Sequence, residues 1–154
     1  MKYCSHLLSP IGLIRITSDD LAITGIEFVS KSTKDTPGPL TTMAVHQLLE
    51  YFEGKRKTFS LPLAYGGTRF QHQVWDALAT IPYGEAVSYA QVARKLRNPK
   101  ACRAVGTANG KNPISIVLPC HRVIAADGTL GGYTGGLAKK RFLLALEGIS
   151  YKEK

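Results

Sequence analysis

The chain has 154 residues, which suffices for one ordinary domain or for a small domain beside a larger one. Its 44% hydrophobic and 20% charged residues are typical of globular proteins and exclude a disordered or fibrous chain. No run of about eighteen apolar residues is present, and the N-terminus lacks the apolar core of a signal peptide. We therefore expect a soluble, cytoplasmic protein without a membrane partner.

The net charge of +9 is distributed unevenly along the chain. Residues 1–67 hold seven Lys or Arg against six Asp or Glu, whereas residues 68–154 hold thirteen against five. Almost all of the positive excess therefore belongs to the second half, which indicates a polyanion as partner. A basic surface that serves only solubility explains the charge equally well.

The three cysteines, Cys4, Cys102 and Cys120, form no C-x-x-C pair and are odd in number. A disulfide framework and a four-cysteine zinc site are therefore not expected. Cys4 lies near His6, but residues 1–67 hold no second cysteine, and we expect no metal there. Free thiols suit a reducing compartment, and one of them is a candidate for chemistry.

The first half is expected to form a small sheet and one helix. Two β-rich runs, 11–16 and 21–29, are separated by an Asp-containing turn, which predicts a β-hairpin. Residues 30–39 are polar with two prolines and predict a surface connection. Residues 40–52 place apolar side chains on one helical face. Residues 58–67 contain a proline and two adjacent glycines, which indicates a linker.

The second half begins with a helical pattern. Apolar residues recur at i, i+4 and i+8 from Phe70, and Pro82 is expected to end that helix. Ser88 is a candidate N-cap for a helix to about residue 96. Asn98-Pro99 indicates an N-cap and first position of a second short helix, to about residue 109. Two short helices joined by a tight turn predict a helix-turn-helix.

The second of these helices has a surface of small side chains, which suits either packing on another helix or close approach to a partner. The small residues are Ala101, Ala104, Gly106, Thr107 and Ala108. Basic residues cluster around both helices, where phosphate contacts would be needed: Arg94, Lys95, Arg97, Lys100, Arg103 and Lys111. The two features together favour DNA binding over packing alone.

The apolar run 114–118, a buried strand or core loop, leads into Pro119-Cys120-His121-Arg122-Val123. The thiolate is the reactive form of cysteine, and a nearby proton acceptor makes it accessible at neutral pH. Adjacent side chains on a strand point to opposite faces, so the dipeptide alone favours a buried, inert cysteine. A glycine-rich loop and a last helix over about 137–147 complete the chain.

A reactive Cys120 becomes the favoured interpretation because of a resemblance. Pro119-Cys120-His121-Arg122-Val123 resembles the active-site signature of the O6-alkylguanine-DNA alkyltransferases, also called methylated-DNA–protein-cysteine methyltransferases. Other blocks are similar in order and spacing: Tyr83-Gly84-Glu85-Ala86-Val87-Ser88-Tyr89, Arg103-Ala104-Val105-Gly106, Asn112-Pro113, Gly132-Tyr133-Thr134-Gly135-Gly136 and Leu146-Glu147-Gly148. The resemblance covers about residues 68–148 strongly and residues 1–67 only in general pattern. It indicates the stand-alone type, without a cysteine-rich regulatory domain.

The resemblance implies a role for each residue of the site. Cys120 is the expected nucleophile and alkyl acceptor. His121 is the expected base, acting through a bridging water, and Glu147 holds and polarises it. Asn112 braces the active-site turn and the thiol. Tyr89 donates a hydrogen bond to the guanine ring as negative charge develops on the leaving base.

The resemblance also implies double-stranded DNA containing O6-alkylguanine as the partner, with the second helix in the minor groove. Ala104 and Gly106 then allow close approach, and Arg103 fills the space of the flipped guanine. The pocket is expected to be lined by Val123, Tyr133 and Thr134. The family resemblance implies irreversible, single-turnover DNA repair by a monomer without a cofactor.

The expected fold class is α+β, with two domains. Residues 1–67 form an N-terminal α/β support domain with a small sheet and a helix. Residues 68–154 form a mainly helical domain with the helix-turn-helix, which binds DNA and accepts the alkyl group.

Three rival functions remain distinguishable on the residues. A non-enzymatic alkyltransferase-like binder has another residue in place of the cysteine, and Cys120 argues against that class. A cysteine hydrolase leaves the basic helix-turn-helix unexplained. A plain DNA-binding regulator retains its full function after Cys120→Ala.

Overall fold

A computed structural model describes residues 1–153 as two compact units. The N-terminal unit comprises Met1–Gly66 together with Pro113–Ser115, and the C-terminal unit comprises Gly67–Asn112 and the chain from Ile116 onward. Lys154, the last residue of the predicted second domain, lies outside the described residues. Within residues 1–153, no helix has both the length and the apolar character needed to cross a membrane.

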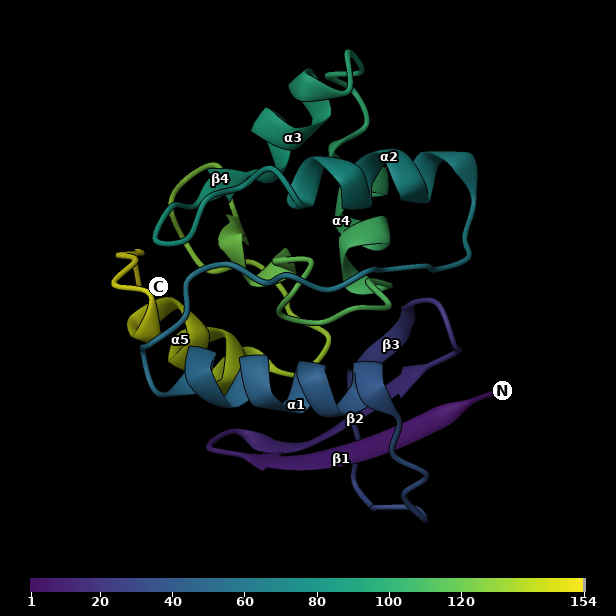
Figure 1. The fold of residues 1–154 in the computed structure, drawn as a ribbon. Coiled ribbons are helices and arrows are strands. Elements are labelled where there is room, and N and C mark those ends of the chain that lie inside the picture. Colours follow the sequence, from purple (N-terminus) through teal and green to yellow (C-terminus); the bar gives the residue numbers. More distant parts are fainter. Residues whose placement is uncertain (154) are drawn as a thin grey trace. The chain divides into compact units, whose positions relative to one another are not determined.

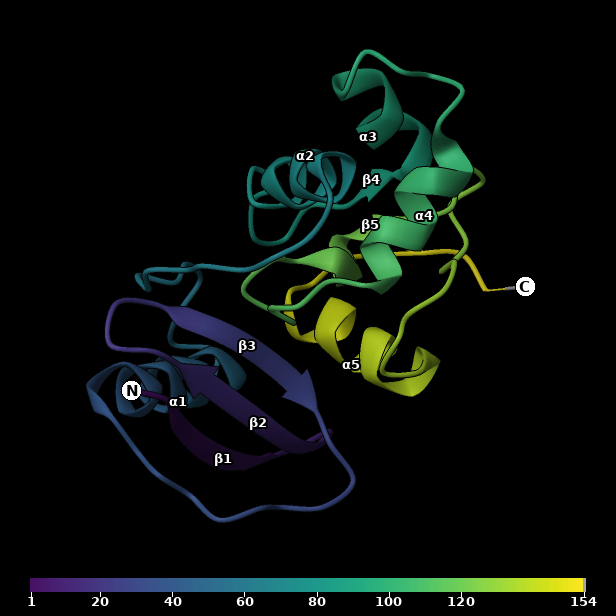
Figure 2. The same cartoon turned by 90° about the vertical axis from the view of Figure 1, so that its right-hand side faces the viewer.

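A three-stranded antiparallel sheet forms the N-terminal unit with one helix (Figure 1). The strands β1 (Tyr3–Ser9), β2 (Gly12–Ser18) and β3 (Ile23–Phe28) pair in chain order. Figure 2 shows the three strands side by side, with helix α1 (Pro39–Phe52) lying along the sheet. The helix packs on β1 and β2, so the core of this unit lies between the helix and one face of the sheet.

The strand β1 is not among the elements that the sequence pattern predicts, since that pattern indicates only a two-stranded hairpin. Its inward positions include two serines, Ser5 and Ser9, whereas the outward Leu8 is exposed. The Ser5 hydroxyl donates to Thr41 Oγ1 on α1 at 2.9 Å, and the Ser9 hydroxyl donates to the Gly12 carbonyl at 2.7 Å. Because these buried hydroxyls have hydrogen-bond partners, serines can occupy the inner face of the strand. The sequence of β1 therefore lacks the apolar–polar alternation by which a strand is recognised.

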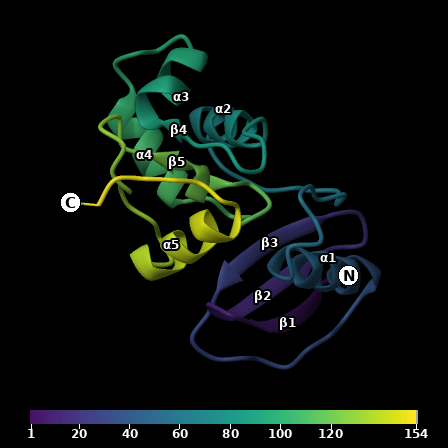
Figure 3. The same ribbon diagram turned by 90° about the vertical axis from the view of Figure 1, so that its left-hand side faces the viewer.

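Three helices form one side of the C-terminal unit, and Figure 3 shows them beside the short strands β4 and β5. They are α2 (Arg69–Leu78), α3 (Tyr89–Lys95) and α4 (Cys102–Gly110), and each contacts the other two. The indole of Trp75, on α2, is buried and donates to the Ala108 carbonyl on α4 at 2.9 Å. This hydrogen bond fixes α4 against α2.

The remaining elements of this unit hold the predicted active-site sequence. The strand β4 (Val87–Ser88) pairs in parallel with β5 (Val123–Ile124), and the 3-10 turn η1 (Cys120–Arg122) directly precedes β5. Helix α5 (Leu137–Leu146) packs against that turn. The α+β fold class predicted from the sequence is confirmed.

Two predicted helix boundaries are corrected. Helix α4 begins at Cys102 rather than at Pro99, because the Asn98 carbonyl accepts from the Ala101 amide at 3.0 Å and closes a separate turn first. Helix α2 ends at Leu78, before Pro82. The active-site sequence, which follows a run predicted as either buried strand or core loop, forms a 3-10 turn, so Cys120 and His121 do not follow strand alternation.

The first helix of the helix-turn-helix, α3, is capped at its N-terminus by Ser88, and this capping role can be tested. The Ser88 hydroxyl accepts from the Gln91 amide at 3.1 Å, and the Gln91 side chain accepts from the Ser88 amide at 2.7 Å. We expect Ser88→Ala to lower the free energy of unfolding by about 1 kcal/mol, measured by urea denaturation. Ser88→Asp keeps an acceptor oxygen and is expected to retain most of the stability. Equal losses in both variants would contradict the capping role.

Candidate active site

Cys120 lies at the start of the 3-10 turn with only 5% of its surface exposed. Two asparagines from the end of α4 and the residues after it hold this turn. Asn112 Nδ2 donates to the Leu118 carbonyl at 2.7 Å, and Asn109 Nδ2 donates to the Cys120 carbonyl at 3.3 Å. The thiol position is thus set by side-chain amides as well as by the turn itself.

His121 and Glu147 form a buried hydrogen-bonded pair. Their side chains have no exposed surface, and His121 Nε2 lies 2.6 Å from Glu147 Oε2. A carboxylate only accepts, so Nε2 carries the proton and Nδ1 of a neutral ring is an acceptor. Nδ1 has no hydrogen-bond partner within residues 1–153. Burial lowers the pKa of His121, which keeps the ring neutral at physiological pH.

Arg122 holds the same carboxylate from the other side. Its Nε donates to Glu147 Oε1 at 2.7 Å and its Nη2 donates to Oε2 at 3.2 Å. The third nitrogen, Nη1, donates to the Ile81 carbonyl at 2.7 Å, and the Gly84 amide donates to Glu147 Oε1 at 3.1 Å. Glu147 is therefore a fixed, charged hydrogen-bond acceptor for His121.

Lys140 on α5 is a buried cation on the other side of the turn. It has no exposed surface, and its Nζ donates to the carbonyls of Val123, Leu130 and Gly132 at 2.7, 2.6 and 3.0 Å. Burial lowers the pKa of Lys140 to about 8, opposed by the negative charge that Cys120 acquires on ionisation. The lysine joins strand β5 to the glycine-rich loop by hydrogen bonds, and its positive charge acts on the Cys120 thiol.

The Cys120 thiol is protonated in the resting site. Burial raises the pKa of Cys120, and this effect outweighs the hydrogen bond from Asn112 and the positive charge of Lys140, which both lower it. A buried protonated thiol beside a neutral imidazole needs proton transfer before it can act as a nucleophile.

A cavity of about 390 Å³, within the usual range for small-molecule sites, adjoins the thiol turn through Asn109, which lines the cavity and donates to the Cys120 carbonyl. It is lined by Tyr89, Gly106, Asn109, Gly110, Gly132, Tyr133 and Thr134. Burial raises the pKa of Tyr89 and raises that of Tyr133 well above its ordinary range, and a Cys120 thiolate raises both further. Both phenols therefore stay protonated and remain available as hydrogen-bond donors.

The loop from Gly131 to Thr134 closes tightly on Tyr89. A Cβ atom on Gly131 would lie 2.9 Å from the Tyr89 hydroxyl, and the φ of Gly131 is +71°. The Thr134 hydroxyl donates to the Gly110 carbonyl at the end of α4. A glycine at 131 is thus needed for the wall of the cavity to approach the phenol.

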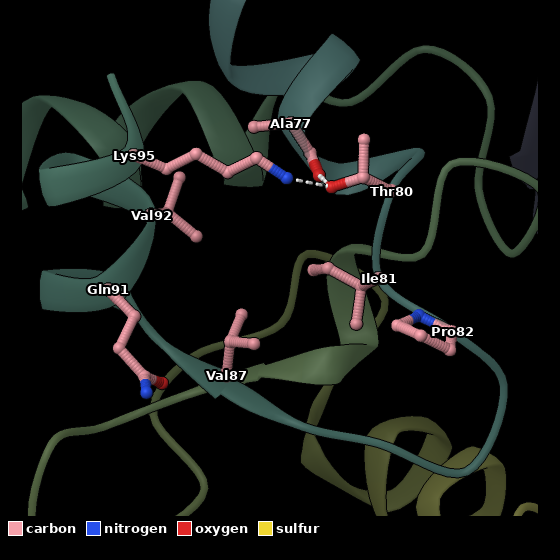
Figure 4. Close-up of a pocket in the computed structure, with 8 residues that line it drawn as sticks. All are labelled: Ala77, Thr80, Ile81, Pro82, Val87, Gln91, Val92 and Lys95. Carbon is pink, nitrogen blue, oxygen red and sulfur yellow. Dashed lines mark hydrogen bonds between the residues drawn. The ribbon is translucent and has the colours of Figure 1, made fainter. Parts of the chain in front are cut away.

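A second cavity lies between the end of α2 and α3 and contains none of the predicted site residues (Figure 4). It has about 210 Å³ and is lined by Ala77, Thr80, Ile81, Pro82, Val87, Gln91, Val92 and Lys95. Its one ammonium group, on Lys95, binds the Thr80 hydroxyl. This cavity offers an apolar surface but no cysteine, histidine or carboxylate.

The outer surface of α4 is exposed and basic. Arg103 and Ala104 are exposed on the first turn of the helix, and Gly106 lies under the ring of Tyr89. The basic residues singled out from the sequence are all exposed: Arg94, Lys95, Arg97, Lys100, Arg103 and Lys111. The helix therefore presents positive charge at its surface, while Asn109 near its end binds the active-site turn.

The structure brings most of the predicted site residues together. Those around the thiol and its cavity are Cys120, His121, Glu147, Asn112, Tyr89, Gly106, Val123, Tyr133 and Thr134. Arg103 and Ala104 lie on the outer surface of α4 instead.

Sequence reasoning missed Lys140, Asn109 and the role of Arg122. A signal for Lys140 exists: it precedes Leu143, Leu144 and Glu147 by three, four and seven residues, which places it on the same helical face.

The site is of the kind in which a cysteine, a neutral histidine and a carboxylate act together. Two family models match the chain over nearly its whole length. Residues 2–65 match the ribonuclease-like domain of 6-O-methylguanine DNA methyltransferase, and residues 69–149 match its DNA-binding domain. The chain belongs to the 6-O-methylguanine DNA methyltransferase family.

Curated relatives and solved structures agree with this assignment. The chain is 45% identical to the constitutive methylated-DNA–protein-cysteine methyltransferase of Bacillus subtilis, with both chains fully covered. It is 46% identical to a Methanosarcina acetivorans protein named methylated-DNA–protein-cysteine methyltransferase, covering 95% of this chain and 98% of the relative. The O6-methylguanine methyltransferase of Mycobacterium tuberculosis superposes with a TM-score of 0.86 at 44% identity, covering 96% and 93% of the two chains.

Lys140 leads to a pH prediction. Its pKa of about 8 lies below the ordinary lysine value of 10.5, so the unfolded chain binds more protons between these pH values. The contribution of Lys140 to the free energy of unfolding therefore rises with pH through this window, by up to roughly 3 kcal/mol. We expect urea denaturation to show that the stability difference between wild type and Lys140→Met grows from pH 8 to pH 10.5.

The matched control is Lys139→Met, which removes a less buried lysine from the same helix. Its stability difference from wild type is expected to change little over this range. If the two variants show the same pH dependence, the depressed pKa is not that of Lys140.

Proposed function

We propose that this chain repairs DNA by moving an alkyl group from the O6 oxygen of guanine to Cys120, irreversibly and once per molecule. The relatives are named for methyl transfer to a protein cysteine, and one solved relative, from Mycobacterium tuberculosis, is a complex with DNA at 46% identity and a TM-score of 0.85. The single observation that carries the proposal is the juxtaposition of Cys120 with the His121–Glu147 pair and a cavity lined by two phenols.

The proposed chemistry begins with loss of the thiol proton. His121 Nδ1, the ring nitrogen that Glu147 does not engage, takes the proton from Cys120 through a bridging water. The thiolate attacks the alkyl carbon, a sulfur–carbon bond forms, and the bond from that carbon to O6 breaks. Its electron pair passes to the guanine ring, where a hydrogen bond from Tyr89 stabilises the developing charge. The guanine anion then takes up one proton, equal in number to the proton lost by the thiol, so that neutral guanine leaves and His121 returns to its neutral form.

The buried charges match these steps. Glu147 stabilises the imidazolium that forms on His121, and the ammonium of Lys140 stabilises the Cys120 thiolate. Asn112 holds the turn and donates to the sulfur as it ionises. The product is a thioether, which water does not hydrolyse, so the protein is consumed. The steps balance without a cofactor, and none is proposed.

Access to the O6 atom requires the guanine to leave the duplex, because the atom is unreachable within the base stack. We propose that α4 enters the minor groove, where Ala104 and Gly106 allow close approach. Arg103 takes the place of the flipped base, and the backbone around Val123, Tyr133 and Thr134 receives the guanine. The exposed basic residues of α3 and α4 support phosphate contacts.

We also propose that the protein acts as a monomer in the cytoplasm. Cys4, Cys102 and Cys120 are free thiols in the structure, which suits a reducing compartment. The site is assembled within one unit of one chain.

Intact-protein mass spectrometry tests the function directly. After mixing with a short duplex that contains one O6-methylguanine, the protein is expected to gain one methyl group on Cys120 and to leave unmodified guanine. Cys120→Ala is expected to gain none and still bind the duplex, whereas Cys4→Ser is expected to react like wild type. Methyl uptake by Cys120→Ala would overturn the assignment, and binding without transfer by wild type would indicate a non-enzymatic lesion binder.

Base flipping is tested with Arg103→Ala. Loss of this side chain is expected to slow transfer from duplex DNA more than transfer from the free O6-methylguanine base, since only the duplex needs flipping. Lys100→Ala removes the same charge from the turn before α4 and should weaken duplex binding without this selective loss of rate. Equal slowing of Arg103→Ala on both substrates would rule out the flipping role.

A further inference from the structure

A second group of chemically reactive side chains lies in the N-terminal unit, on the edge strand β1. Cys4 and His6 are two residues apart and therefore lie on the same face of the strand. The residues between and after them, Ser5 and Leu7, are buried on the opposite face, toward the core. The edge strand thus directs a thiol and an imidazole away from the core.

The segment that connects β3 to α1 runs along this edge. Thr36 and Cys4 exchange two backbone hydrogen bonds of 2.9 Å, and the Thr33 amide donates to His6 Nε2 at 3.3 Å. Between them, Asp35 reaches His6, with Oδ1 at 2.6 Å from Nδ1. The backbone ladder therefore fixes the carboxylate beside the imidazole.

One ligand-type atom from each of Cys4, His6 and Asp35 lies within 4.8 Å of the other two. The donor set is one sulfur, one nitrogen and one oxygen, which suits a borderline divalent cation such as Zn²⁺. Tetrahedral zinc holds such donors about 3.6 Å apart or slightly closer, from bond lengths of about 2.0–2.3 Å. Three bonds therefore require the Cys4 sulfur to approach by up to roughly 1 Å, while His6 Nδ1 and Asp35 Oδ1, which are 2.6 Å apart, separate by somewhat less than that.

We propose that Cys4, His6 and Asp35 bind one zinc ion that fastens the segment 29–38 to the edge of the sheet. The Cys4 thiol loses its proton to solvent, and the imidazole stays neutral as its proton passes from Nδ1 to Nε2. The long Thr33 contact at Nε2 then opens. A thiolate and a carboxylate balance the charge of the ion, so the completed site is neutral.

The surroundings allow a fourth ligand. The Asp35 side chain is 50% exposed, whereas that of His6 is only 7% exposed. Solvent therefore reaches the carboxylate side of the cluster, where water completes the coordination. No metal was expected here from the sequence because residues 1–67 contain only one cysteine. That expectation did not consider Asp35 as a ligand. The site lies outside the alkyl-transfer site and takes no part in the proposed function.

Metal binding is tested in full-length protein that carries Cys102→Ser and Cys120→Ser, so that Cys4 is the one remaining thiol. Titration with Co²⁺ as an optical probe is expected to give the thiolate-to-cobalt charge-transfer absorption at one ion per chain, and Zn²⁺ should displace it. Adding Cys4→Ser should abolish the absorption. Absence of the absorption in the parent protein would overturn the proposal.

The contribution of Asp35 separates a metal site from a simple His–Asp hydrogen bond. Asp35 is exposed, so Asp35→Asn is expected to fold. Its zinc affinity, measured by competition with a chromophoric chelator, is expected to fall by more than the roughly 10- to 100-fold that loss of an orienting partner costs. Asp76→Asn, on α2, should bind like the parent. Zinc should raise the unfolding temperature of the parent and not that of Asp35→Asn. If the parent and Asp35→Asn bind zinc with equal affinity and are stabilised equally by it, Asp35 is not a metal ligand and only hydrogen-bonds to His6.

Discussion

The buried carboxylate of Glu147 is the constraint on which the rest of the active site depends. A carboxylate without water is costly unless several donors surround it, and this one receives His121, both Arg122 contacts and the Gly84 amide. These donors come from the thiol turn and from the chain before β4, whereas Glu147 itself directly follows α5. Satisfying one charge therefore fixes the orientation of the imidazole and ties three segments together. Removal of a single partner of such a buried ion pair typically costs about 3–5 kcal/mol, so the arrangement is rigid.

Helix α5 delivers a second charge of opposite sign to the same turn. Lys140 and Glu147 are seven residues apart, two turns along one helical face, and both are buried. The lysine faces Cys120, which needs a positive neighbour when it ionises, and the glutamate faces His121, which needs a negative neighbour when it is protonated. Both charges stabilise the state after proton transfer more than the state before it. The buried cation and anion are therefore placed to stabilise the ion pair that the proposed proton transfer from the thiol to the imidazole creates.

Local pattern was sufficient to predict the fold class and the two short helices. The Cys120–His121–Glu147 group was predicted only through the family resemblance, because the Cys120-His121 dipeptide alone favours an inert cysteine and Glu147 is remote in the chain. Local pattern was insufficient where a polar residue replaced an apolar one in the core. The first strand was missed because Ser5, a polar residue, occupies a buried position. Its hydroxyl donates to Thr41 on α1, a partner remote in the sequence that a local pattern does not reveal. Lys140 resembled one more basic residue in a basic half, although its helical position matched the buried face. Three carbonyls compensate its burial, and they converge only in the folded chain.

Helix α4 connects the proposed DNA surface to the thiol. Its first turn presents Arg103 to solvent, and its last turn holds Asn109, which binds the carbonyl of Cys120. Trp75 fixes the helix by its hydrogen bond to Ala108, so the two ends cannot shift independently. The helix that carries the proposed DNA surface therefore also holds the turn that positions the nucleophile. A DNA surface at one end and a brace for the thiol turn at the other give a reason for small exposed residues and a buried asparagine on one short helix.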